Sequence, residues 1–389
     1  MIFKDLLQIG VWPEIDRVAY ILLGVALLMF LLNLCMRVWE FYMLKGRVQV
    51  DSEREERYGN PTEGVSVIIT VNNNAELLSK NLPLFLNQNY PNFEVIVVDE
   101  ASDDDTIDVL NILTSKYSNL RVSRLYPGVK FHRTKKIALN IGILAAKNDI
   151  LLFSEIYCAP RTDSWIREMA AQFSVGTNVV IGGSYYPQQN RGMDFLRLNH
   201  NIHTLSRLFM CRVGVVEGPD LANYGYRKSL YLMCRGFSRN NQQLIGYERE
   251  MVKKILELKP ASYSWNYSNN AAIDYMPIRS ILVNDEEYYY AEKREWSIKS
   301  ILIADAPQWL RLITYILIVA LTIFAHFPIW FAAILFLLTF FGDFLCLFFQ
   351  MRTMLQRKLF ITSLMSNTIC FVGRWGSRVK TLASVSRWK

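Results

Sequence analysis

A run of carboxylates at the end of an apolar segment is the feature of this sequence best suited to chemistry. Residues 93–106 read FEVIVVDEASDDDT, so Asp99 and Glu100 directly follow four β-forming residues. A Val/Ile run without polar alternation is typical of a strand buried on both faces, and ligands of such parallel sheets bind beyond the carboxyl ends of the strands. Carboxylates accept hydrogen bonds from a base N–H or from ribose hydroxyls but repel phosphate. The pair therefore predicts a site for the nucleoside end of a nucleotide.

A structural alternative explains the same residues without a ligand. Ser102 has the side chain of a helix N-cap, and Asp103, Asp104 and Asp105 would then lie in the first turn of the helix. Acidic side chains are favourable there because they face the positive end of the helix dipole. The sequence alone leaves both interpretations open.

The elements that position these acids alternate regularly between strand and helix. Such alternation predicts a doubly wound α/β fold, in which a mostly parallel sheet carries helices on both faces. Beyond Pro160 the pattern loosens, and we expect a mixed α and β half that completes the site. The expected strands are residues 65–71, 94–98, 120–125, 149–153 and 179–185, and the expected helices are 76–87, 106–116, 135–146, 165–173, 193–210 and 249–258.

The composition excludes an ordinary soluble enzyme. The chain of 389 residues is 51% hydrophobic, and this excess lies in three segments, 18–36, 312–325 and 329–349. A helix of about 20 apolar residues crosses the roughly 30 Å hydrocarbon core of a bilayer. The sequence therefore predicts a retained N-terminal anchor and a C-terminal helical hairpin, with Trp309 and Trp330 at the level of an interfacial aromatic belt.

The positive charge indicates how these segments are oriented. Lys and Arg follow the first and third segments, and the hairpin loop has neither. The positive-inside rule then places the region between the first two spans, and the C-terminal tail, in the cytoplasm. Part of the net charge of +8 would face membrane lipids, so we expect no nucleic-acid partner. The six cysteines show no paired spacing that indicates zinc or disulfides.

Two further features lie near the C-terminus. Asp343 stands inside the third apolar segment, where a charge is costly, so it marks either a functional residue or a carboxyl paired inside a helical bundle. Residues 359–373 are apolar but short and are followed by basic residues, which favours an interfacial helix over a fourth span.

Five motifs in order resemble a membrane-anchored bacterial glycosyltransferase of family 2, which has the GT-A fold. They cover roughly residues 65–255, and one alone would be a weak signal, whereas five at the spacing of the family are a strong one. The motifs are VSVIITVNNNAELL, NLPLFLNQNYPNFEVIVVDEASDDDT, KKIALNIGILAAKNDILLF, NYGYRKSLYLMCRGF and GYEREMVKKI.

The resemblance implies an organisation in three parts. Residues 1–50 would form the transmembrane anchor, 51–300 a cytoplasmic GT-A domain with a Rossmann-like, mostly parallel sheet, and 301–389 the transmembrane hairpin and basic tail. The expected location is the bacterial inner membrane, in biosynthesis of a cell-envelope polysaccharide.

The resemblance also implies an inverting transfer, in which an acceptor hydroxyl displaces a nucleoside diphosphate from the sugar. Glu248 lies at the position of the base, and its place in the first turn of a helix predicts an ionised carboxylate. A surface Glu that stabilises the helix dipole is the alternative. The residues that would bind the nucleotide are Thr70, Asn73, Asp99, Glu100, Lys135 and Lys136.

The metal motif of the family is altered in this chain. Where the family has Asp-x-Asp to hold Mg²⁺ or Mn²⁺ on the diphosphate, the sequence has Glu155, Ile156 and Tyr157. Three interpretations follow. Glu155 holds the metal alone, or cations such as Lys135, Lys136 and Arg133 carry the charge of the leaving group, or the site is inactive. Two further family carboxylates are also replaced, by Asn74 and Tyr247.

The acceptor side is expected at Asn223, Arg227 and Trp296. The segment YYYAEKREWSIKSI stands where processive members carry QxxRW but lacks that spacing, which favours transfer of a single sugar. The leading hypothesis is a membrane-bound transferase that moves a sugar from a UDP-sugar to a lipid-linked or membrane-proximal glycan acceptor. The alternative is a non-catalytic GT-A domain that binds a nucleotide sugar or scaffolds a polysaccharide assembly complex. A transporter ranks third.

Overall fold

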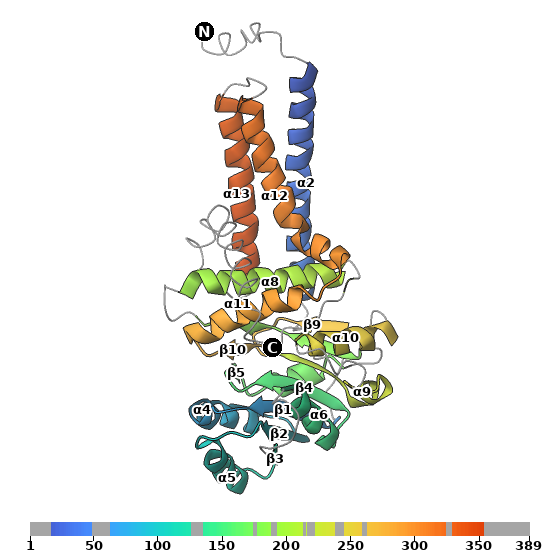
Figure 1. Ribbon diagram of the computed structural model, residues 1–389, viewed down its shortest axis with the longest axis vertical. Helices are drawn as coiled ribbons and strands as arrows, with labels where there is room; N and C mark the ends of the chain where they lie inside the picture. Colours follow the sequence, from blue (N-terminus) through green and yellow to red (C-terminus); the bar gives the residue numbers. More distant parts are fainter. Residues whose placement is uncertain are drawn as a thin grey trace.

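The computed structural model describes residues 17–48, 63–125, 135–173, 177–187, 193–212, 215, 222–237, 245–258, 263–323 and 329–353. Three long helices stand side by side at one end of the molecule and an α/β domain lies at the other (Figure 1). Two further helices, α8 (Asp194–Arg212) and α11 (Arg279–Lys293), cross between them. The α/β domain is therefore attached to the apolar helices through a helical layer.

A seven-stranded sheet forms the centre of the α/β domain, in the order β3-β2-β1-β4-β8-β6-β9. Strands β3, β2, β1 and β4 are mutually parallel, β6 and β9 are parallel to each other, and β8 runs antiparallel to both of its neighbours. The predicted mostly parallel sheet is confirmed. The strands are β1 (Val65–Val71), β2 (Phe93–Asp99), β3 (Leu120–Arg124), β4 (Ile150–Glu155), β6 (Val179–Gly182), β8 (Tyr224–Arg227) and β9 (Tyr263–Asn266).

Both faces of the sheet are covered, which explains the unbroken apolar runs of the central strands. In β1, Ile68 packs into one core cluster with Ala138 and Ile143, whereas Val67 and Ile69 pack into the cluster on the opposite face. The helices that supply the two clusters include α4 (Ala75–Leu86), α5 (Thr106–Lys116), α6 (Lys135–Ala145), α7 (Trp165–Ala170), α9 (Lys228–Met233) and α10 (Tyr247–Leu258).

The strand predicted over residues 179–185 is wrong as a single element. The chain leaves the large sheet after β6, and β7 (Ser184–Tyr185) joins a second sheet of order β5-β10-β7. The break falls at Gly182 and Gly183, where a Cβ would come within 3 Å of side-chain atoms of Asn223 or Tyr185. Glycine is needed here because neighbouring groups approach the backbone closely. The other strands of this sheet are β5 (Cys158–Pro160) and β10 (Ile273–Tyr275).

The three long helices, α2 (Arg17–Val48), α12 (Ile298–Ile323) and α13 (Ile329–Thr353), are each long and apolar enough to cross a membrane. The second begins at Ile298, fourteen residues before the predicted apolar segment, because a more polar stretch that contains Pro307 continues the helix downward. Figure 1 shows that this lower part bends away from the bundle. The predicted interfacial helix at 359–373 lies outside the described residues.

Asp343 is paired inside the bundle, as the second of the two interpretations predicted. Its carboxylate is 3.2 Å from Nε of Arg37 and 3.2 Å from Nε of Arg311, and it accepts a hydrogen bond of 3.1 Å from Asn33 Nδ2. One residue from each of the three long helices is therefore held in the same ionic cluster.

Candidate functional site

The carboxyl ends of three adjacent strands bring the predicted acids to one edge of the sheet. Thr70, near the end of β1, lies opposite Glu155 of β4 on one side and Val98 of β2 on the other. Asp99 ends β2 and Glu100 follows it. The edge is fixed by backbone register, so residues more than fifty positions apart in the chain become neighbours.

Glu100 faces this edge and interacts with Thr70. The two side chains share a hydrogen bond, and the pKa of Glu100 is raised because burial outweighs the attraction of Lys135. The hydroxyl and the carboxyl group present hydrogen-bonding atoms at the point where the parallel strands end. This position suits recognition of a polar ring or a sugar hydroxyl.

Asp99 is buried and contacts neighbouring groups of the protein. Its Oδ1 accepts hydrogen bonds from the Ser102 amide (3.0 Å) and the Ser102 hydroxyl (2.5 Å), and its Oδ2 is 3.2 Å from Arg124 Nε. The backbone of Asn73 has a φ of +51°. Its backbone N–H donates to the Ser102 hydroxyl, and its side-chain Oδ1 accepts from the backbone N–H of Asp103. These contacts join the loop after β1 to the loop after β2. Asp99 and Asn73 thus shape the edge of the site from within the protein.

The alternative of a helix N-cap at Ser102 is wrong. Helix α5 begins at Thr106 with Asp105 as its cap residue, and the side chain of Asp105 makes no cap hydrogen bond. Asp104 accepts from the amides of Thr106 and Ala75, so this acid also connects the two loops. The acidic run therefore builds the loop pair rather than the first turn of a helix.

A lysine and two glutamates form the centre of the site. The ammonium of Lys135, at the start of α6, contacts Oε1 of Glu155 and lies 4.0 Å from Oε1 of Glu248. The two carboxylates raise the pKa of Lys135 to about 12 despite its burial. Lys135 is therefore a permanent cation between residues of β4 and α10.

Glu248 is buried, and its ionisation differs from the prediction. Its side chain is 3% exposed, and burial raises its pKa from 4.5 to about 7, although Lys135 acts in the opposite direction. The helix N-terminus was expected to keep this carboxylate ionised, but loss of hydration has the larger effect. The surface alternative is wrong for the same reason. Its Oε2 has no hydrogen-bond partner among the described residues, although it is inaccessible to solvent.

Tyrosine side chains surround Glu248. The pKa values of Tyr224, Tyr247 and Tyr288 are all raised, first by burial and next by the negative charge of Glu248. These phenols remain protonated at physiological pH. The aromatic wall lowers the local polarity and so explains why a glutamate here titrates near neutrality.

The residues present do not fit a divalent cation. Glu155 is already engaged by Lys135, and the ring of Tyr157 stacks on Tyr275 with centroids 5.9 Å apart. No group of three or more potential metal ligands occurs among the described residues. Mg²⁺ and Mn²⁺ prefer several oxygen ligands of high charge, and one carboxylate with an ammonium on it does not supply them. Of the three interpretations, the one in which cations such as Lys135 carry the charge of the leaving group agrees best with these contacts. Arg133, which was named with them, lies outside the described residues.

Lys136 differs from its neighbour. Its ammonium lies 6.0 Å from the ring centroid of Phe237 and 5.9 Å from that of Tyr247, and burial lowers its pKa. The charge of Glu248 acts on this pKa in the opposite direction. Lys136 therefore contributes packing and positive potential at the margin of the site.

The three residues expected on the acceptor side do not meet at the site. Arg227 lies opposite Ile150, the first residue of β4, because β8 is antiparallel, and it binds Glu63 and Asp149 there. Its expected role is therefore not supported. Asn223 is buried and binds Trp165 Nε1 and the carbonyl oxygens of Gly183 and Ala271, whereas Trp296 packs against Tyr289 beside Lys293.

Helix α11 contributes residues that the sequence analysis did not assign to the site. The hydroxyl of Tyr288 accepts a hydrogen bond of 3.2 Å from the Gly246 amide, just before α10. Glu292 is buried and lies 2.7 Å from Arg207 Nη2 of α8 and 3.7 Å from Arg249 Nε of α10. The turn that presents Glu248 is thus fixed by a helix forty residues further along the chain, which no local sequence signal indicates.

The fold and this edge of carboxyl and ammonium groups define a GT-A domain. Residues 66–233 match the family described as "Glycosyl transferase family 2", so this part of the chain is a glycosyl transferase family 2 domain. The resemblance to glycosyltransferase family 2 that was inferred from the five motifs is confirmed.

Known relatives match part of the chain. This chain is 32% identical over 130 residues to "Glycosyltransferase AglE" of Haloferax volcanii. The match covers 33% of this chain and 41% of the relative. It is 32% identical over 101 residues to the "Dolichyl N-acetyl-alpha-D-glucosaminyl phosphate 3-beta-D-2,3-diacetamido-2,3-dideoxy-beta-D-glucuronosyltransferase" of Methanococcus voltae, covering 25% of this chain and 30% of the relative. The matches thus span less than half the length of these relatives.

A solved structure extends the likeness in fold. The "Mannosyltransferase PcManGT from Pyrobaculum calidifontis in complex with GDP-Man and Mn2+" superposes with a TM-score of 0.51 and 15% sequence identity, and the match covers 89% of this chain and 98% of that one. At this identity the likeness shows the fold.

Proposed function

We propose that this protein is an inverting glycosyltransferase that moves a sugar from a nucleotide sugar, in the first instance a UDP-sugar, to a hydroxyl of a lipid-linked or membrane-proximal glycan. The observation that carries the proposal is Glu248, a buried carboxyl with a pKa of about 7 beside the ion pair of Lys135 and Glu155. A general base works best when its pKa lies near the working pH.

The chemistry follows from the three side chains. Ionised Glu248 accepts the proton of the acceptor hydroxyl while that oxygen forms a bond to the anomeric carbon. The bond from this carbon to the diphosphate breaks in line, and the electron pair leaves with the diphosphate. Lys135, held by Glu155, supplies the positive charge that stabilises the leaving group. No divalent cation is required in this scheme.

Recognition of the nucleoside is assigned to the ends of β1 and β2. Thr70 and Glu100 supply the hydrogen-bonding groups, and Asn73 and Asp99 hold the loops that present them. The complex of the Pyrobaculum calidifontis structure with GDP-mannose supports a nucleotide sugar as the donor class.

The membrane location rests on the three long helices. Each meets the length and hydropathy of a span, and basic residues follow the first and the third. We assign residues 51–300 to a cytoplasmic domain between an anchor at 1–50 and the hairpin and tail at 301–389. The dolichyl-linked substrate named for the Methanococcus voltae relative supports a lipid-linked acceptor. A bacterial inner membrane and an envelope polysaccharide remain the expected setting.

The test combines nucleotide binding with transfer. Calorimetric titration of the full-length protein in detergent with UDP and with GDP measures binding, and transfer of radiolabelled sugar from the matching donor to membrane lipids measures turnover. Binding with transfer that E248Q abolishes supports the proposal. Binding without any transfer by the wild-type protein favours the non-catalytic domain instead. Absence of binding to both nucleotides rejects the transferase and leaves only the scaffold.

A further inference from the structure

The first turns of α12, residues 298–306, carry exposed apolar side chains outside the candidate site. Ile298 is 79% exposed and Leu302 is 60% exposed, and Ile298 is the most exposed large apolar side chain among the described residues. The two lie four positions apart and therefore share one face of the helix. Apolar side chains that are exposed together indicate contact with another apolar surface.

Another side of the same segment is fixed to the helical layer of α8 and α11. Asp305 binds Lys293 of α11 at 2.5 Å, and the Ser206 hydroxyl of α8 donates a hydrogen bond of 3.2 Å to the carbonyl oxygen of Ala304. The side chain of Ala304 packs into a buried cluster with Tyr289 of α11. The segment therefore rests on this layer, and its exposed face is turned away from it.

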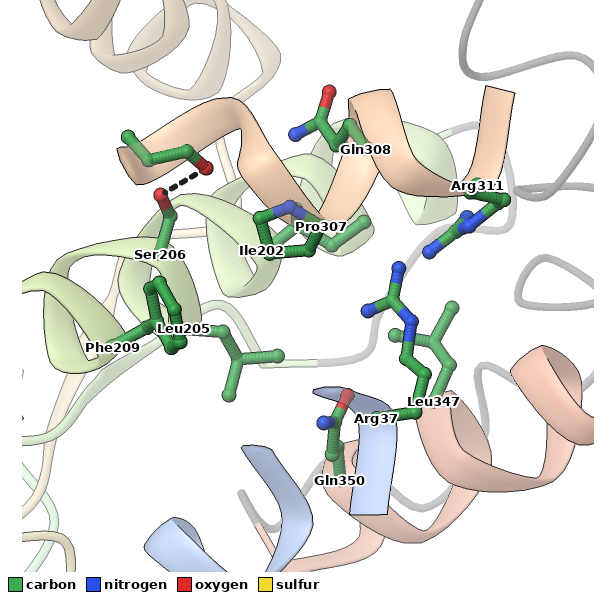
Figure 2. Close-up of a pocket in the computed structure, with 11 residues that line it drawn as sticks. Arg37, Ile202, Leu205, Ser206, Phe209, Pro307, Gln308, Arg311, Leu347 and Gln350 are labelled. Carbon is green, nitrogen blue, oxygen red and sulfur yellow. Dashed lines mark hydrogen bonds between the residues drawn. The ribbon is translucent and has the colours of Figure 1, made fainter. Parts of the chain in front are cut away.

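Pro307 marks the point where this segment departs from the direction of the span. Proline inside a helix removes a backbone hydrogen bond and bends the axis, and Figure 1 shows the lower part of α12 bent away from the bundle. Pro307 lines a small, mainly apolar cavity between α2, α8, α12 and α13, together with Ile202 and Leu205 of α8 (Figure 2). Helices α8 and α12 are in contact, so packing holds the bend in place.

The length of α12 bears on where its first turns lie relative to a membrane. Its 26 residues extend over about 39 Å, whereas the hydrocarbon core of a bilayer is roughly 30 Å thick. A straight helix would place Ile298 about 16 Å beyond Trp309, the residue expected at the interfacial aromatic belt, and hence in water. The bend instead allows residues 298–306 to run along the membrane surface, at the level of the lipid headgroups.

We propose that residues 298–306 form an interfacial helix in the bilayer surface, with Ile298 and Leu302 inserted at the boundary between headgroups and acyl chains. Lipid is the partner of this face because the face continues into the apolar span of the same helix. Arg294 and Lys299 are exposed beside the apolar pair, where their charges complement lipid phosphates. The contact of Asp305 with Lys293 then ties the helical layer to the membrane surface. This inference rests on the membrane location given under the proposed function.

The test places the photoreactive residue benzoylphenylalanine at single positions of the full-length protein in nanodiscs of phosphatidylcholine. Probes in place of Ile298 and of Leu302 are expected to form covalent lipid adducts on irradiation, detected by mass spectrometry of the protein. Both positions are exposed, so neither probe displaces a packed side chain. Ile112 is the matched control, because this isoleucine of α5 is 66% exposed on the α/β domain. A probe there should give no lipid adduct above the background of unmodified protein.

A probe at Ile316 separates this inference from the membrane location itself. Ile316 lies in the apolar part of α12 and is 56% exposed, so it should react with lipid if α12 crosses the bilayer. Adducts at Ile316, with either Ile298 or Leu302 no more reactive than the Ile112 control, would overturn the inference alone. No adduct at Ile316 would reject the membrane location and the inference with it. Crosslinks from Ile298 or Leu302 to a second protein chain in place of lipid would assign the face to contact between copies of this chain.

Discussion

At the scale of single residues, the site depends on burial more than on local sequence. Glu248 stands at a helix N-terminus, where a carboxylate is usually ionised, yet burial among tyrosines raises its pKa to about 7. Lys135 keeps its charge because two carboxylates surround it. Both effects are properties of the packed site and lead to separate predictions.

The first prediction concerns pH. Glu248, the proposed base, can accept a proton only when it is deprotonated, so transfer activity should fall as the pH decreases through about 7 and level off above it. The measurement is kcat for transfer between pH 5 and 9 with saturating donor. A rate that stays constant down to pH 5 would exclude Glu248 as the base.

The second prediction separates stability from activity in E248Q. The pKa of Glu248 is 4.5 in the unfolded chain and about 7 in the folded protein. The free energy of unfolding therefore decreases as the pH rises from 4.5 through 7, because the buried carboxyl group must ionise. The amide does not ionise. E248Q should therefore lower transfer roughly 10²- to 10⁴-fold and raise the free energy of unfolding at pH 8 by up to about 3 kcal/mol.

Thermal unfolding at pH 5 and pH 8 checks the stability part of this prediction. The difference between E248Q and the wild type should be larger at pH 8. An E248Q protein that is less stable than the wild type at pH 8 would show that Glu248 is held by attractive interactions that outweigh its desolvation.

The third prediction tests whether a lysine replaces the metal. K135M should reduce transfer roughly 10²- to 10³-fold, because one electrostatic donor to the leaving group is lost, whereas K136M should have a smaller effect. Treatment with EDTA should leave wild-type transfer unchanged. Loss of activity in EDTA that added Mn²⁺ or Mg²⁺ restores would return the metal to the mechanism.

At the scale of elements, α11 connects the site to the long helices. Its Glu292 pairs with Arg207 of α8 and approaches Arg249 of α10, while Lys293 binds Asp305 of α12 at 2.5 Å. All five side chains are largely buried, so removing one partner takes a counter-charge away from a buried ion.

The fourth prediction follows from this network. E292Q should destabilise the protein by about 3–5 kcal/mol, because Arg207 and Arg249 lose their shared carboxylate in a buried place. E295Q, on an exposed residue just beyond the same helix, is the control and should have little effect. Chemical unfolding in detergent compares the two variants, and equal stabilities would mean that the network contributes little.

At the scale of the whole molecule, the α/β domain and the apolar bundle lie at opposite ends of the chain's long axis, with α8 and α11 between them (Figure 1). This arrangement places the domain beside one face of a membrane if the three helices span it. An acceptor held in that membrane would be concentrated near the enzyme, as an effective-concentration argument predicts.

The fifth prediction tests the orientation. S115C places a thiol on the exposed surface of α5, far from the long helices in the chain. A membrane-impermeant maleimide should label it only after cells are permeabilised, because the positive-inside rule puts this domain in the cytoplasm. Wild-type protein labelled in parallel measures the background of the native cysteines, and labelling of S115C in intact cells would reverse the topology.

The sequence by itself determined the alternation of strands and helices, the three apolar helices, and the placement of Thr70, Glu100 and Glu155 near strand ends. These features depend on local periodicity and on the rule that parallel strands end at one edge, so they are readable without coordinates. The resemblance to the family rests instead on the likeness of the five motifs to it.

Only the tertiary structure decided which of these residues act together. Arg227 lies away from the carboxyl ends of the parallel strands because β8 is antiparallel to β4. Lys135 of α6 binds Glu155 of β4. Glu248 is buried among tyrosines from three separate elements. The cavity between α2, α8, α12 and α13 likewise joins residues that are hundreds of positions apart. Strand direction, burial and long-range ion pairs arise from packing, and no local pattern of residues encodes them.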